Sequence, residues 1–293
     1  MTGRVTVLAL VLVLAVRVGS LAGADLTTGL ILDYTFDGQP TGYTVHGATK
    51  TADRFGIPGQ AYFFNGLDSY LDLPDEATAQ FTVSIWVRTG WGNSGPLPIP
   101  IVDGWSGGEV FAIQYRDNLE LIEGPTEGPF ASEVGEYVGY VGPGNYLIGS
   151  FHPWASDSET EPESNLARQA CPRHRPSGLS PKKSCITCHD QYPERHLAYP
   201  LTLDHSTWRH VAISYDGALA RLYLDGSQVV SFKFDENLTT TPADGLDWDE
   251  YLALVDLALA RSKRFETFFY GSLDEFRLYN RALSAEEVAE LAR

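Results

Sequence analysis

Residues 271–291 read GSLDEFRLYNRALSAEEVAEL, and this stretch decides the fold class of the chain. Its first part alternates apolar and polar residues, which is typical of β-strands with one buried face. In its second part Ser284 stands three residues before Glu287, the spacing of a helix capping box, ahead of a short apolar run. We therefore expect a last pair of strands over 269–279, followed by a short C-terminal helix.

Short runs of the same strand-like texture recur along most of the chain. They lie at 29–38, 59–66, 69–73, 81–88, 208–217, 220–226 and 227–232. Two further runs, 111–115 and 119–122, are expected to form a hairpin around 116–118. The 28 glycines and 17 prolines suit a protein with many turns. The whole pattern predicts an all-β protein.

Several of these runs also carry a family pattern. It is seen at Phe63, Asn65–Gly66, Ser84–Val87, Trp208–Ala212, Leu222–Gly226 and Gly271–Ser284. The pattern resembles the LamG-like jelly roll of the concanavalin A-like lectin/glucanase superfamily, over roughly residues 25–123 and 207–293. The resemblance implies a two-sheet antiparallel jelly-roll sandwich with the short C-terminal helix. Residues 124–206 interrupt it and are expected to form a long irregular insertion, within which 146–149 could still be a strand of the sandwich.

The N-terminus reads as a secretory signal peptide over residues 1–24. Arg4 is followed by an apolar run from Val5 to Val16, and Ala22–Ala24 has the small residues of a cleavage site. The apolar run is too short to cross a bilayer. We expect a mature sandwich domain over 25–293, located outside the cytoplasm of a bacterium, either secreted or periplasmic.

Charge narrows the choice of partners. The formal net charge of −17 argues against nucleic acids and against anionic membrane surfaces. No segment after the signal peptide is long and apolar enough to predict a membrane span. A protein or a glycan is the expected kind of partner.

The motif with the most chemical content is Cys185-Ile186-Thr187-Cys188-His189. The C-x-x-C-H spacing is the attachment signature of c-type haem. Cys185 and Cys188 would form the thioethers, and His189 would be an axial ligand of the iron. The sequence thus predicts extracytoplasmic electron transfer with a redox partner protein or another cytochrome, with the sandwich as a docking or adhesion module.

The distal haem ligand is expected to be a second histidine. The chain has one methionine, Met1, and it lies in the signal peptide, so the mature protein has no methionine ligand. His196 and His174 are the candidate distal ligands, and a histidine from a neighbouring chain is a further option. His210 falls in a strand motif and is expected to be a residue of the sandwich.

Two other arrangements of the cysteines stay open. Cys171 and His174, together with Cys185 and Cys188, form two paired hooks that would suit a structural zinc site. A disulfide could instead link Cys185 with Cys188, or Cys171 with either of them. In both arrangements the chain would be a non-redox module that binds carbohydrate or protein.

Catalysis by the sandwich itself is not expected. The E-x-D-x-x-E strand pattern of the glucanases is absent, because Glu120 and Glu123 lack the carboxylate between them. The family resemblance implies two other features. One is a candidate calcium site involving Asp37 and Asp274. The other is carbohydrate binding by aromatic side chains, for which Trp91, Trp105 and Trp154 are candidates.

Overall fold

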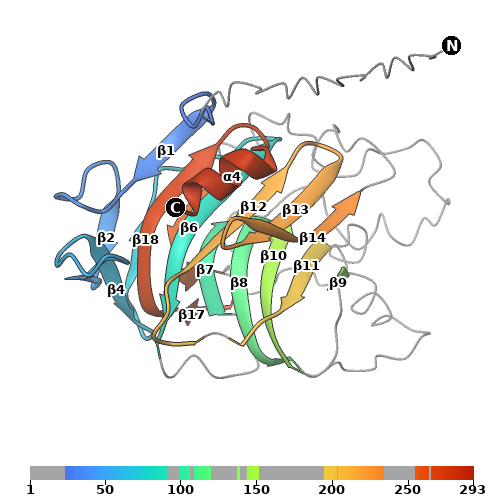
Figure 1. Ribbon diagram of the computed structural model, residues 1–293. Helices are drawn as coiled ribbons and strands as arrows, with labels where there is room; N and C mark the ends of the chain where they lie inside the picture. The colour runs from blue at the N-terminus through green and yellow to red at the C-terminus, as the bar shows by residue number, and fades with distance from the viewer. Residues whose placement is uncertain are drawn as a thin grey trace, which may run out of the picture.

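Two eight-stranded β-sheets pack face to face in the computed structural model (Figure 1). The residues that it describes are 24–90, 99–105, 109–119, 137–138, 144–151, 195–202, 204–233, 255–263 and 265–293. The two sheets, antiparallel except for one strand pair, confirm the all-β jelly-roll sandwich expected from the sequence.

Sheet A has the strand order β14-β13-β12-β6-β18-β4-β3, and β1 pairs with β18 beside β4. Its strands are β1 Leu30–Tyr34, β3 Thr49–Thr51, β4 Ala61–Asn65, β6 Phe81–Thr89, β12 Arg209–Tyr215, β13 Leu219–Leu224, β14 Ser227–Lys233 and β18 Tyr270–Tyr279. The last of these contains the first nine residues of the stretch 271–291, and it lies near the middle of the sheet. Residues from the two ends of the chain therefore pair directly in β1 and β18.

Sheet B has the order β2-β5-β15-β7-β8-β10-β11-β9. Its strands are β2 Thr44–His46, β5 Tyr70–Asp72, β7 Ile99–Trp105, β8 Glu109–Leu119, β9 Tyr137–Val138, β10 Gly144–Phe151, β11 Arg195–Pro200 and β15 Asp256–Leu259. The pair formed by β9 and β11 is parallel. A small hairpin of β16 Arg261–Ser262 and β17 Thr267–Phe268 forms a separate two-stranded sheet next to β7.

Sheet B differs from the sequence expectation in two places. The predicted hairpin around 116–118 is wrong, because β8 runs without a turn from 109 to 119 between β7 and β10. In addition, the range 124–206 contributes two of the long strands of sheet B: β10, which includes the possible strand at 146–149, and β11, which was not expected from the sequence. Over 116–119, pairing with β10 outweighs the local turn preference of Asp117 and Asn118.

The hydrophobic core lies between the sheets and follows the two-residue period of the strands. Phe81, Val83, Ile85 and Val87 of β6 alternate with outward-pointing residues and belong to the core. The ring of Phe81 packs on that of Phe111 from sheet B, with 5.0 Å between the ring centroids. These contacts hold the sheets together and leave the alternate residues of β6 for the outer face of sheet A.

A short helix, α4 (Ala285–Leu291), lies over one end of that outer face (Figure 1). The capping box expected from the sequence is present, since Ser284 accepts from the Glu287 backbone and Glu287 from the Ser284 backbone. Val288 and Leu291 pack against Tyr223 and other side chains of sheet A. Within the described ranges, no helix is long and apolar enough to span a membrane.

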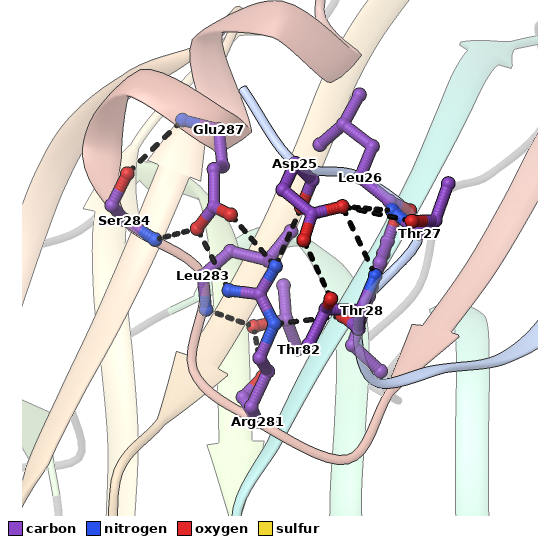
Figure 2. A network of polar contacts seen from close by, with 10 residues as sticks. Asp25, Leu26, Thr27, Thr28, Thr82, Arg281, Leu283, Ser284 and Glu287 are labelled. Carbon is purple, nitrogen blue, oxygen red and sulfur yellow. Dashed lines mark hydrogen bonds and ion pairs between the residues drawn. The ribbon is translucent and has the colours of Figure 1, made fainter. Parts of the chain in front are cut away.

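Arg281 connects the N-terminal segment to this helix (Figure 2). Its guanidinium donates to the backbone carbonyls of Asp25 and Thr28 at 2.7 and 2.8 Å. It also forms a two-pronged ion pair with the Glu287 carboxylate, at 2.8 and 2.7 Å. Thr82 of β6 holds the turn between β18 and α4, accepting from the Leu283 backbone at 2.8 Å. The turn and both segments are thereby fixed to the centre of sheet A.

Candidate binding face

Two rows of side chains cross the outer face of sheet A beyond the reach of α4. The first row is Phe63, Ser272, Arg88 and Trp208, and the second row is Asp274, Trp86 and His210. They point away from the core because their neighbours along each strand point into it. Trp208 precedes β12 and meets the first row through its ring, which lies 4.9 Å from the Arg88 guanidinium carbon.

His210, in the second row, is fully buried and uncharged. Its Nε2 lies 2.8 Å from the Ser84 hydroxyl, and its ring packs edge-on against Trp86. Burial lowers the pKa of His210 to about 3, and the nearby charges of Arg277 and Arg54 act in the same direction. The expectation that His210 is a residue of the sandwich is therefore confirmed.

A bulge in β18 shapes the edge of this face. Along one edge, β18 pairs with β4 up to Leu273 and with β1 from Phe276 onwards. Along its other edge it pairs with β6, and the register of this pairing shifts between Asp274 and Arg277. Glu275 in the bulge has a φ of 48°, a left-handed conformation uncommon for glutamate. Its carboxylate forms ion pairs with Arg54 and with Arg277, which hold the bulge in place.

Asp274, next to that glutamate, is a buried acid. Its side chain is 2% exposed and accepts a hydrogen bond from the Glu275 backbone at 2.9 Å. Burial raises the pKa of Asp274 to about 7, and the negative charges of Glu275 and Asp53 add to the effect. The group is thus partly protonated at neutral pH, in contrast to ordinary surface carboxylates.

The loop from 52 to 60 fills the gap between β4 and β1 and presents two exposed apolar side chains. The buried carboxylate of Asp53 accepts from the backbone of Phe55 at 2.9 Å and of Ile57 at 2.7 Å, which fixes the loop. Phe55 is 66% exposed and Ile57 is 47% exposed. The loop therefore holds an aromatic ring and an aliphatic side chain towards solvent in a defined conformation.

Arg54 joins Phe55 to the sheet. Its guanidinium carbon lies 4.3 Å from the ring centroid of Phe55 and 4.6 Å from that of Trp86, while Glu275 binds it from the side. The result is a supported aromatic surface on the outer side of the sheet. We call Phe55, Ile57, Phe63, Arg88 and Trp208 the outer-face patch.

The face of sheet B that points away from the core carries a second polar row. Asp103, Ala112, Ser150 and His196 are cross-strand neighbours, and all four are buried. The Ser150 hydroxyl lies 2.7 Å from Nδ1 of His196. Asp103 is two strands away from Ser150, roughly 10 Å by strand spacing, so it does not complete a Ser-His-Asp arrangement.

Most residues of the predicted haem site lie outside the described residues. These are Cys185, Cys188, His189 and His174, and the same holds for Cys171 of the alternative zinc site. His196 is described: it lies on β11, 6% exposed, with its ring oriented by Ser150. The role of His196 as the distal haem ligand stays a prediction.

The two acids of the predicted calcium site have different surroundings. Asp37 lies exposed in the loop after β1, whereas Asp274 is buried in β18. In the described part of the chain, no three His, Cys, Asp or Glu side chains form a group that could hold a metal ion. Calcium at these positions stays a prediction that the described geometry does not strengthen.

The family comparison agrees with the sheet arrangement. Residues 186–289 match the family model described as the concanavalin A-like lectin/glucanases superfamily. The matched range includes β11 to β14, β18 and most of α4. It supports the LamG-like jelly roll that the sequence pattern resembles. No curated protein matches the chain.

Solved structures show distant similarity. Domain 4 of AbnA, a GH43 extracellular arabinanase from Geobacillus stearothermophilus, solved in complex with arabinotriose, is 18% identical with a TM-score of 0.49, covering 90% of this chain and 98% of that one. The botulinum neurotoxin type G receptor binding domain is 12% identical with a TM-score of 0.47, covering 90% of this chain and 51% of that one. The assignment of the fold rests on the sheets themselves, because both scores are below 0.5.

The aromatic residues predicted for sugar binding fall outside what the structure describes, so their role stays a prediction. Trp91 and Trp154 lie outside the described residues, as does the side chain of Trp105 at the end of β7. The outer-face patch was not expected from the sequence. Asp53 and Gly56 indicate a turn around Phe55, but the exposure of the ring depends on Arg54 and Glu275, which are far apart in the sequence.

Proposed function

We propose that this chain is an extracytoplasmic, non-enzymatic recognition module that binds a glycan with the outer-face patch. The LamG-like sandwich is a rigid scaffold, and a binding site on it needs side chains that are both exposed and ordered. The proposal is carried by Phe55, which is 66% exposed yet supported by Arg54 and Trp86. An aromatic ring held in this way can pack against the C–H face of a sugar without losing conformational freedom on binding.

The test is binding of the mature chain, residues 25–293, to an array of oligosaccharides, followed by titration of the best ligand. Phe55→Ala should weaken binding roughly ten-fold or more, because it removes the ring but no core contact. Leu67→Ala is the matched control, since Leu67 is 76% exposed and follows β4 at its other end. If the chain bound no glycan on the array but bound a cell-surface protein saturably, the proposed ligand would be a protein and not a glycan.

A second candidate function is electron transfer by a covalently attached c-type haem. It is favoured by the C-x-x-C-H motif at 185–189 and supported by the buried, oriented imidazole of His196. Cys185 and Cys188 would hold the haem, with His189 and His196 as axial ligands. The haem would supply a one-electron couple, and the outer-face patch would then dock the partner.

The visible spectrum of the protein, produced together with the haem-attachment machinery of a bacterium, decides between the two. A Soret band and a pyridine haemochrome of the c type would support haem, and Cys185→Ala with Cys188→Ala should abolish both. His196→Ala should change the low-spin bands, whereas the control His205→Ala should not. A colourless protein with one equivalent of zinc would support the structural zinc site instead.

A further inference from the structure

Among the residues that the structure describes, Arg88 differs from the other arginines around the outer face of sheet A in having no acidic partner. Arg54 pairs with Glu275, Arg277 with Asp33 and Glu275, Arg209 with Asp225, and Arg221 with Asp216. In the described part of the chain, Arg88 has one hydrogen bond, to the neutral Ser272 hydroxyl at 3.3 Å, and the ring contact with Trp208. This is notable in a chain with 38 acidic and 21 basic residues.

The position of Arg88 is also unusual for an unpaired charge. It is half-buried in the first row, with the 2%-exposed Ser272 beside it on β18 and Trp208 over its guanidinium. A guanidinium offers five N–H donors in a flat fork, of which one is used here by a side chain. The indole Nε1 of Trp208 is a further buried donor with no partner among the described residues.

These donors point to a ligand with a carboxylate. A carboxylate matches the guanidinium fork with two parallel hydrogen bonds, and such pairs are stronger than neutral ones. Trp208 would contact the ring that carries the carboxylate, and Phe63, three strands away at the other end of the row, would contact another sugar of the same glycan. Since the whole chain is strongly acidic, isolated carboxylates suit it better than a densely charged polyanion.

We infer that the outer-face patch selects glycans that contain a uronic acid, and that Arg88 binds the uronate carboxylate. This inference rests on the glycan binding proposed above and names the class of sugar. The inference places recognition of the charged group in the first row and not in the loop that contains Phe55. Phe55 and Ile57 would contribute to affinity for neutral and acidic sugars alike.

The test compares three ligands of one shape on the mature chain by calorimetry: trigalacturonic acid, its methyl ester and galactotriose. The acid should bind about ten-fold tighter than the ester or more. Arg88→Gln should remove that preference, so that the acid and the ester bind alike, and Arg88→Lys should keep part of it. The control Arg221→Gln removes a charge that already has a partner, so it should leave the preference intact.

Each result has a separate meaning. Equal affinity for the acid and the ester overturns the role of Arg88, even if both bind and the proposed glycan function stands. A preference that survives in Arg88→Gln places the carboxylate elsewhere and also overturns it. If none of the three ligands binds while another glycan does, the inference fails alone; if no glycan binds at all, both proposals fail. Should Arg88→Gln not fold, the comparison of acid with ester in the unmodified protein still decides.

Discussion

Asp274 and His210 lie on either side of Trp86. We expect ionisation of these two groups to change the free energy of unfolding in opposite directions as the pH rises. The pKa of Asp274 rises from an ordinary 3.8 to about 7 in the fold. Its folded form therefore binds the proton more tightly than its unfolded form. Stability that is present below about pH 4 is lost as the pH rises to about 7, and the loss amounts to about 4 kcal/mol.

His210 acts in the opposite sense. Its pKa falls from an ordinary 6.5 to about 3, so the unfolded chain takes up a proton that the folded chain does not. Stability that is present above pH 6.5 is lost as the pH falls to about 3, by about 5 kcal/mol. Between about pH 4 and 6.5 the two effects nearly cancel, with each changing by about 1.4 kcal/mol per pH unit.

Asp274→Asn separates the two effects. The amide oxygen can still accept from the Glu275 backbone, so the main change is the lost ionisation. At pH 8 the variant should be more stable than the unmodified protein, by up to about 4 kcal/mol, and near pH 4 the two should be equally stable. Below pH 6.5 the variant should lose stability steadily, because the effect of His210 is no longer offset.

The measurement is urea unfolding of both proteins from pH 4 to 8.5, with the difference in unfolding free energy plotted against pH. Contributions from all other titrating groups cancel in this difference. Asp37→Asn, at an exposed position, measures the effect of removing one surface carboxylate. A difference between Asp274→Asn and the unmodified protein that stays constant across this range would refute the reasoning.

Two further predictions concern packing and the Arg281 network. Gly149→Ala should destabilise the sandwich by about 1–3 kcal/mol in urea unfolding, because a Cβ there would lie 2.6 Å from Ile213 Cγ2 of the facing sheet. Gly38→Ala is its control, since a Cβ there meets nothing within 4 Å, and equal effects of the two changes would contradict the packing argument. Arg281→Lys should lower the melting temperature almost as much as Arg281→Ala, because one ammonium group cannot serve both backbone carbonyls and the Glu287 carboxylate. Full rescue by lysine would show that only the charge matters.

The sandwich could be predicted largely from local patterns. The alternation in 81–88 and the capping box at Ser284 each depend on residues close together in the sequence, and both segments form the expected strand and helix start. The hairpin around 116–118 was wrong because the turn-forming residues there lie in a strand that continues alongside β10. Which strands fall inside 124–206 depends on long-range pairing, which no short window of sequence contains.

The candidate site could be predicted much less well. Exposure of Phe55, and the lack of an acidic partner for Arg88 among the described residues, are properties of the assembled face. They arise from residues far apart in the sequence, such as Arg54 and Glu275 at a separation of 221. The sequence motif at 185–189 has clear chemistry but lies outside the described residues. A covalent attachment motif can be recognised from the spacing of its residues, whereas a recognition surface can be identified only once the fold is known.

The bonds of Arg281 have a consequence for how such a domain can be combined with others. The backbone at 25–28 and the start of α4 both contact one side chain, and α4 is only about 10 Å long. Linkers that enter before residue 25 and leave after α4 would therefore be close together in space. A domain with this geometry can be inserted into a surface loop of a host protein, or circularly permuted with a short joining peptide, with little disturbance of either sheet.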